Sequence, residues 1–282
     1  MKILVTGANG YIGRHVVTQL LNDGHHVLAC DIKLDDVDPR AEKIEFNLFQ
    51  LPKKSVFETL GSPDICLHMA WRNGFVHNSP TQMGDLSGHY NFLTSLIDGG
   101  LKHLAVMGSM HEVGYWEGAI TEDTPCNPSS MYAIAKDSLR RAITLYCKNK
   151  DVVLQWLRCY YILGDDGKNN SIFTKLSHAA KEGKKTFPFT TGKNKYDFID
   201  VDQLAILISA SISQTEINGI INCCTGTPVS LAERVEQYIR DNGLDIELEY
   251  GAFPDRPYDS PCIYGDPLKI NTILSAKKLS EG

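Results

Sequence analysis

Two pairs of tyrosine and lysine have the four-residue spacing that suits acid–base chemistry on one helix face. They are Tyr132 with Lys136 and Tyr146 with Lys150. Side chains four residues apart project from the same face of a helix, so the lysine ammonium can stabilise the tyrosine phenolate. We expect this contact to lower the tyrosine pKa from about 10 toward neutral, as a general acid or base requires.

The position of each pair in the chain separates them. The first pair follows CNPSSM at the start of a helix with an apolar face, whereas the second runs into the polar sequence KNKD. We therefore predict that Tyr132 and Lys136 are catalytic. The second pair is predicted to lie at a solvated helix end.

The amino terminus predicts a dinucleotide site. An apolar strand over 2–6 is followed at once by Gly7, Gly10 and Gly13, and then by a helix over 11–21. Glycines at such a strand–turn–helix junction let the backbone approach a diphosphate, which the amino terminus of the helix stabilises.

The next strand indicates which dinucleotide binds. Asp31 closes the apolar run HVLACD. A carboxylate at this position accepts hydrogen bonds from ribose hydroxyls and repels a 2′-phosphate, which favours NAD(H). Arg14 and Lys33 are nearby cations that could accept a 2′-phosphate, so NADP(H) stays possible.

The elements that must position these residues alternate along the first half of the chain. Apolar runs such as KILVTG and HLAVMGS are separated by stretches with helical spacing. This alternation predicts an α/β fold, a Rossmann-like doubly wound parallel sheet over 1–163. The looser pattern over 164–282 predicts a smaller mixed α/β substrate lobe, and the chain may cross between the two parts around 197–225.

Composition excludes several function classes. The net charge of -6 gives no basic surface for nucleic acid or an anionic membrane, and no apolar run approaches a membrane span. The eight cysteines form no CxxC pair, which favours free thiols in a reducing cytoplasm. Neither cysteine nor histidine shows metal-ligand spacing, so we expect no metal.

Taken together, the segments TGANGYIG, DICLHMA, YAIAK and TTGKNKYDFIDVDQLA resemble the extended short-chain dehydrogenases/reductases, the NAD-dependent epimerase/dehydratase family. The resemblance covers nearly the whole chain and implies an NAD(P)-dependent oxidoreductase that modifies nucleotide sugars. It implies that the cofactor is contacted by Gly7, Asn9, Gly10, Tyr11, Ile12, Gly13, Asp31, Ile32, Lys33, Asn47, Leu48, Met69, Ala70, Trp71, Tyr132 and Lys136.

The loop GSMHEVGYWEG departs from this family, whose members often show Ser/Thr-x-x-Val-Tyr-Gly. Aligning Val113 with that valine puts Met110 at the hydroxyl position and Ser109 one residue early. Either Ser109 serves after a slip of register, or the hydroxyl is missing and His111 or Glu112 takes over part of its role. The candidate catalytic residues are therefore Tyr132, Lys136, Ser109, Met110, His111 and Glu112, and the candidate substrate-binding residues are Arg72, Ser109, His111 and Arg256.

The segment around GSMHE is most similar to that of the 4-ketoreductases that form dTDP-6-deoxy-L-talose from dTDP-4-keto-6-deoxy-L-mannose. The resemblance thus implies a 4-ketoreductase of a nucleotide-activated deoxysugar. A nucleotide-sugar 4-epimerase is the alternative within enzymes, and a non-catalytic dinucleotide-sensing regulator is the alternative outside them. The family also implies a homodimer, with the stretches 83–100 and 130–149 as candidates for its interface.

Overall fold

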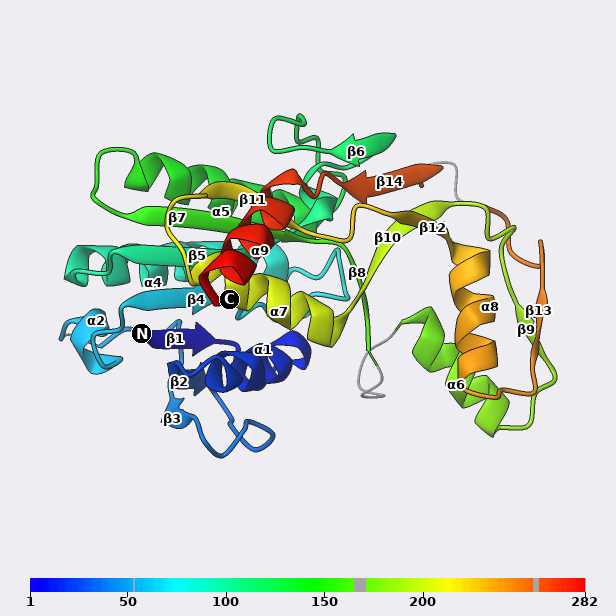
Figure 1. The fold of residues 1–282 in the computed structure, drawn as a ribbon, viewed down its shortest axis with the longest axis horizontal. Coiled ribbons are helices and arrows are strands. Elements are labelled where there is room, and N and C mark those ends of the chain that lie inside the picture. The colour runs from blue at the N-terminus through cyan, green and yellow to red at the C-terminus, as the bar shows by residue number, and fades with distance from the viewer. Residues whose placement is uncertain (53, 165–170, 256–258, 282) are drawn as a thin grey trace.

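The computed structural model describes residues 1–52, 54–164, 171–255 and 259–281. Within them, parallel strands form a seven-stranded sheet in the order β11-β7-β5-β4-β1-β2-β3, shown in Figure 1. The strands are β1 (Lys2–Thr6), β2 (His26–Asp31), β3 (Glu42–Glu45), β4 (Ile65–His68), β5 (His103–Ser109), β7 (Val153–Cys159) and β11 (Gly219–Cys223).

Helices cover both faces of this sheet (Figure 1). The helices α1 (Tyr11–Asn22), α7 (Val201–Ile212) and α9 (Leu268–Glu281) pack on one face. The other face is covered by α2 (Val56–Thr59), α4 (Leu86–Gly99) and α5 (Met131–Cys147), and the short α3 (Thr81–Gly84) contacts α4 and α5. The predicted Rossmann-like doubly wound fold is therefore confirmed.

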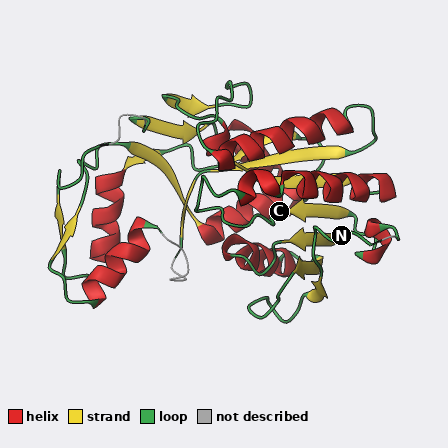
Figure 2. Cartoon of the chain, turned by 180° about the vertical axis from the view of Figure 1, so that it is seen from behind, coloured by secondary structure: helices red, strands yellow, loops and turns green. Residues whose placement is uncertain are grey.

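A smaller lobe lies to one side, and in Figure 2 its helices stand apart from the large sheet at the left. Its strands are β6 (Gly118–Ile120), β8 (Tyr161–Leu163), β9 (Thr186–Pro188), β10 (Lys195–Asp200), β12 (Pro228–Ser230), β13 (Glu247–Glu249) and β14 (Cys262–Gly265). Strands β12-β10-β14-β6 form one sheet, to which β8 adds through β10, and β13 pairs with β9. The helices α6 (Ile172–Lys181) and α8 (Leu231–Asp241) complete the lobe.

The chain passes between the two parts more than once. After β10 it returns to the large sheet through α7 and β11, and after β14 it returns again through α9. Conversely, β6 belongs to the first half of the chain but pairs with β14 in the smaller lobe. A single cut between 163 and 164 therefore does not separate the two cores, and the division into two domains stays a prediction.

The topology brings the candidate residues to one edge. Strand β1 lies between β2 and β4, so the chain order of the strands reverses at β1 and β4. Ligands of open α/β sheets bind outside the carboxyl ends of the strands at such a reversal. The start of α1, the residues after β4 and the end of β5 all lie at this edge.

None of the helices in the described ranges is both long enough and apolar enough to cross a membrane.

Candidate active site

The glycine turn after β1 leaves room for backbone only. Gly7 has φ of +72°, and a Cβ there would lie 2.7 Å from backbone atoms of Ala70. A Cβ on Gly13 would lie 2.1 Å from the carbonyl oxygen of Gly7. Helix α1 then begins after Gly10, whose position has no side-chain capping bond, so its first N–H groups are available to an anion.

Asp31 borders this turn from the end of β2. Its carboxylate accepts hydrogen bonds from the backbone N–H of Asn9 at 3.1 Å and of Ile32 at 2.8 Å. The side chain of Asn9 in turn accepts a bond from the backbone of Asp36 at 2.9 Å. The side chains of Ile32 and Lys33 are exposed, so this corner forms an open rim.

The side chains of several other predicted cofactor residues pack or form hydrogen bonds within the protein. Met69 and Ile12 pack against the core on the α1 face, and Ala70 and Leu48 belong to the core on the α4 face. Asn47 accepts a bond from the backbone of Phe49 at 3.0 Å. The hydroxyl of Tyr11 lies against Gly164, where a Cβ would approach it to 1.9 Å.

Tyr132 and Lys136 lie in the first two turns of α5. This helix begins after Ser130, whose side chain accepts a bond from the N–H of Ala133 at 3.3 Å. The Ser109 hydroxyl acts on the Tyr132 phenol and lowers its pKa. The Lys136 ammonium is 3% exposed and donates to the carbonyl oxygen of Met107 at 2.7 Å.

The pKa of Tyr132 differs from the sequence expectation. Burial raises the pKa of the phenol, although the Ser109 hydroxyl bond opposes this shift. Burial also lowers the pKa of Lys136 to about 8. The expected lowering of the tyrosine pKa by lysine was wrong for this structure, because desolvation of the phenolate outweighs the stabilising contacts.

The register of the GSMHE loop follows from a short 3₁₀ helix, η1 (Met110–Glu112), which begins directly after β5. Ser109 is its N-cap and accepts a bond from the backbone of His111 at 3.3 Å. Met110 is buried in a separate apolar cluster with Val113 and Tyr160. Thus Ser109, and not Met110, is the residue of this loop whose side chain acts on the phenol.

Glu112 faces the protein interior, so its predicted catalytic role is not supported by its contacts. The side chain is fully buried, and its carboxylate accepts bonds from the Ser109 backbone at 2.7 Å and from the Trp156 indole at 2.9 Å. The buried Arg158 guanidinium lies 3.5 Å away. Because these donors occupy the carboxylate, the role its contacts indicate is to hold the backbone of Ser109 in place.

His77 lies beside Tyr132 in the candidate site, although no sequence pattern singled it out. Its ring stacks on the Tyr132 ring with centroids 5.2 Å apart, and it meets the His111 ring edge-on at 4.7 Å. Its backbone carbonyl also accepts the Tyr132 N–H at 2.8 Å. Burial lowers the pKa of His77, and it lowers that of His111 to about 4, so both imidazoles are neutral at neutral pH. No local motif around His77 marks this role.

The two arginines expected at the substrate have different outcomes. Arg72 is exposed and forms a bidentate ion pair with Asp85 immediately before α4. Its contact with substrate stays a prediction. Arg256 lies outside the described residues.

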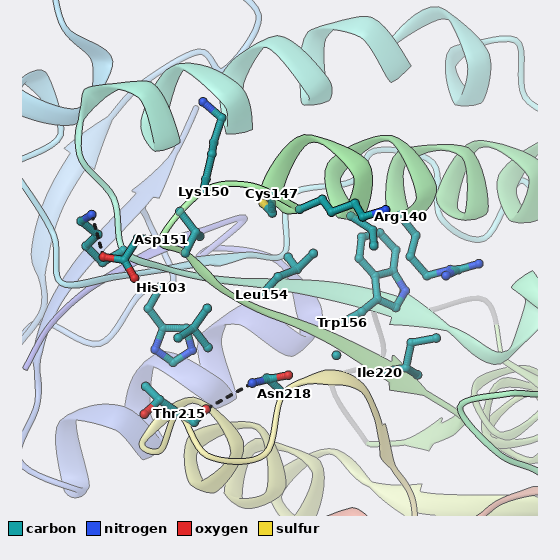
Figure 3. Close-up of a pocket in the computed structure, with 16 residues that line it drawn as sticks. His103, Arg140, Cys147, Lys150, Asp151, Leu154, Trp156, Thr215, Asn218 and Ile220 are labelled. Atoms are coloured by element: carbon teal, nitrogen blue, oxygen red, sulfur yellow. Dashed lines mark hydrogen bonds and ion pairs between the residues drawn. The ribbon is translucent and has the colours of Figure 1, made fainter.

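The second tyrosine–lysine pair lies at the far end of α5. The Tyr146 hydroxyl and the Lys150 ammonium both bind the exposed carboxylate of Asp98, at 2.6 and 2.9 Å. A groove of about 700 Å³ is lined by His103 and Gly219, which begin their strands. Figure 3 shows Lys150 beside this groove. This groove is at the amino ends of the strands, opposite the edge that holds Tyr132. No group of histidine, cysteine or acidic side chains in the described ranges could hold a metal ion.

The buried histidines predict a loss of stability in acid. The His68 ring is hydrogen-bonded to Thr6 Oγ1 at 2.8 Å and to His89 Nδ1 at 3.0 Å. Burial lowers the pKa of His68 well below its usual value, and it lowers the pKa of His89 to about 3. An imidazole in the unfolded chain has a pKa of about 6.5, so below that pH the unfolded chain binds protons that the folded chain does not. Stability should therefore fall between about pH 7.5 and about pH 5.5, by roughly 1 kcal/mol per buried imidazole.

Urea unfolding at a series of pH values measures this slope. The variant His89→Phe should reduce the slope of unfolding free energy against pH by the contribution of one imidazole. The exposed control His26→Asn should leave this slope unchanged. An unfolding free energy that is constant over this range would contradict the prediction.

This combination of a glycine turn on a Rossmann-like sheet with a serine–tyrosine–lysine cluster defines a short-chain dehydrogenase/reductase of the extended type. The profile of the family described as "NAD dependent epimerase/dehydratase family" matches residues 3–224. The chain belongs to this family and is an oxidoreductase of the extended short-chain type.

Several of its relatives are named as enzymes that act at C4 of nucleotide sugars. The chain is 43% identical over 271 residues to a dTDP-6-deoxy-L-talose 4-dehydrogenase (NAD(+)) of Aggregatibacter actinomycetemcomitans, covering 94% of this chain and 99% of that one. It is 26% identical to a UDP-glucose 4-epimerase of Lactobacillus helveticus, covering 100% of this chain and 93% of the relative. Among solved structures, a UDP-glucuronic acid 4-epimerase from Bacillus cereus matches the fold with a TM-score of 0.80, 21% identity, and coverage of 98% and 93%.

Proposed function

We propose that this protein is a 4-ketoreductase of a nucleotide-activated deoxysugar, and that it converts dTDP-4-keto-6-deoxy-L-mannose to dTDP-6-deoxy-L-talose. The observation that carries the proposal is that Ser109 at the end of β5 acts on the Tyr132 phenol and lowers its pKa, with Lys136 one helical turn further along α5. The relative with 43% identity supports the substrate, since its name describes the reverse, oxidative direction of the same conversion.

The residues around the glycine turn fit a dinucleotide. Only backbone lies where Gly7 meets Ala70, so a diphosphate can approach the first N–H groups of α1. Asp31 would hold the adenosine ribose and disfavour a 2′-phosphate, which supports NAD(H) over NADP(H). When bound, the reduced nicotinamide supplies the hydride that is added to C4 of the sugar.

The side chains of this chain supply the proton. Tyr132 donates its phenolic proton to the oxygen at C4 as hydride addition turns the carbonyl into an alkoxide, and the Ser109 hydroxyl donates a hydrogen bond to the same oxygen. Because burial raises the pKa of Tyr132, the phenol stays protonated at neutral pH and is ready to donate. The Lys136 ammonium stabilises the phenolate until solvent returns a proton.

A panel of dTDP-, GDP-, UDP- and CDP-linked 4-keto sugars tests the proposal. With NADH, the dTDP substrate should cause loss of the reduced nicotinamide absorbance, and NMR of the product should show the talo configuration. A sugar isomer formed with no net consumption of NADH would instead identify a 4-epimerase. Binding of NADH without turnover of any substrate would identify a dinucleotide sensor. The homodimer stays a prediction; Leu145 on α5 is 72% exposed and is available for such an interface.

A further inference from the structure

Trp71 is held in a fixed orientation beside the catalytic cluster. It follows β4, and its indole N–H donates to the side-chain oxygen of Gln82 at 2.7 Å. Gln82 is itself 1% exposed and donates to the carbonyl oxygens of Asn73 and Val76 at 2.9 and 3.2 Å. The His89 ring lies flat against the indole, with centroids 4.5 Å apart and planes 6° apart. The indole therefore has little freedom to move.

The Lys136 ammonium lies over this indole, with Nζ 4.0 Å from the ring centroid. The Tyr132 ring meets the same indole edge-on at 6.1 Å. Thus Trp71 contacts both members of the tyrosine–lysine pair. A cation over an indole face is attracted by the ring quadrupole, and the attraction is strongest where water is excluded.

Apart from the indole, the charge of Lys136 is supported mainly by the attraction of the Glu112 carboxylate, which raises the lysine pKa against the effect of burial. Within the described ranges it forms no ion pair, and the carbonyl oxygen of Met107 is its hydrogen-bond acceptor. The charged and titratable groups that act on it or face it are Glu112 on η1, Cys159 on β7, His68 on β4, His89 on α4 and Tyr132 on α5 itself. The carboxylate of Glu112 is already bound by Ser109, Trp156 and Arg158.

We propose that Trp71 is a positioning residue for Lys136, and that its indole face keeps the buried ammonium protonated and close to the Tyr132 phenol. Gln82 fixes the angle of the indole, and His89 supports it by stacking. The link to catalysis rests on the proposed function, because Lys136 stabilises the Tyr132 phenolate there. The effect on the ammonium itself does not depend on any substrate.

The direct test measures Lys136 in the protein alone, by ¹³C NMR of lysine-labelled protein over a pH series, with Lys136→Arg to assign the signal. Trp71→Leu removes the ring and Trp71→Phe keeps a weaker one, and both lose the bond to Gln82. We expect the Lys136 pKa to fall from about 8 by about one unit in Trp71→Leu, which corresponds to about 1.4 kcal/mol, and by less in Trp71→Phe. The control Trp116→Phe, which also removes an indole N–H donor, should leave it unchanged.

Equal shifts in the leucine and phenylalanine variants, or no shift in either, would overturn the proposal, because only the aromatic face distinguishes them. If the leucine variant does not fold, a Trp71→Phe variant with an unchanged Lys136 pKa overturns it as well.

The second readout is the pH profile of kcat/KM for reduction of the keto sugar. Its basic limb should move to lower pH by the shift that NMR measures, while a Lys136→Arg background should abolish this movement. Should the protein reduce no keto sugar, the proposed function fails and the NMR result still decides whether Trp71 acts on Lys136.

Discussion

Replacing Tyr132 by phenylalanine should lower kcat for reduction of the keto sugar by about 10²- to 10⁴-fold, the usual contribution of a positioned general acid. The variant loses the hydroxyl whose pKa Ser109 lowers and that would protonate the C4 oxygen. Its ring can still stack on His77, so the fold and the affinity for NADH should change little. Steady-state kinetics and a fluorescence titration with NADH measure the two effects separately.

The chain provides a matched control in Tyr146→Phe. Tyr146 has the same spacing to a lysine, but its hydroxyl binds the exposed Asp98. This variant should keep kcat within about twofold of the parent, since an exposed polar contact contributes little. Similar kinetic losses in both variants would refute the assignment of the catalytic pair.

Replacing Glu112 by glutamine should destabilise the protein by about 3–5 kcal/mol, the cost of breaking a buried ion pair from one side. The buried guanidinium of Arg158 would lose its nearest carboxylate, 3.5 Å away. The amide oxygen of glutamine can still accept the N–H of Ser109, so we expect the loss of stability to exceed the loss of activity. Urea unfolding followed by tryptophan fluorescence measures the first quantity.

A matched control for this variant is Glu122→Gln. Glu122 pairs with Lys269 at the surface, so removing its charge should cost at most about 1 kcal/mol. If Glu112 were instead a proton donor to substrate, the glutamine variant would retain its unfolding free energy and lose kcat. That result would restore the catalytic interpretation of the GSMHE loop.

Local patterns were sufficient to predict the glycine turn after β1 and the place of Tyr132 and Lys136 near the start of α5. The glycine turn and the pair of Tyr132 and Lys136 each depend on spacing within one turn or one helix. The register of Ser109 was left open, because it depends on a 3₁₀ turn that directs Met110 into an apolar cluster. A pattern of residue spacing does not show where such a turn begins, so it could not decide between Ser109 and Met110.

Other features depend on contacts between distant segments. Glu112 is neutralised by Arg158, which lies on a neighbouring strand, and His77 reaches Tyr132 from the loop after β4. The direction of the Tyr132 pKa shift was missed for the same reason, since burial of the phenol is a property of the packed site. Sequence spacing identifies residues that can meet, but tertiary packing decides their charge state.

The return of the chain to the large sheet sets an order for folding during synthesis. Strand β7 ends at Cys159, but its neighbour β11 begins at Gly219, and α9 reaches the same core only after residue 268. While the intervening residues leave the ribosome, one edge of β7 and part of the α1 face remain uncovered. Unpaired edges of this kind are where nascent chains associate wrongly. A protein truncated before β11 should therefore be retained by chaperones rather than accumulate as a folded nucleotide-binding half.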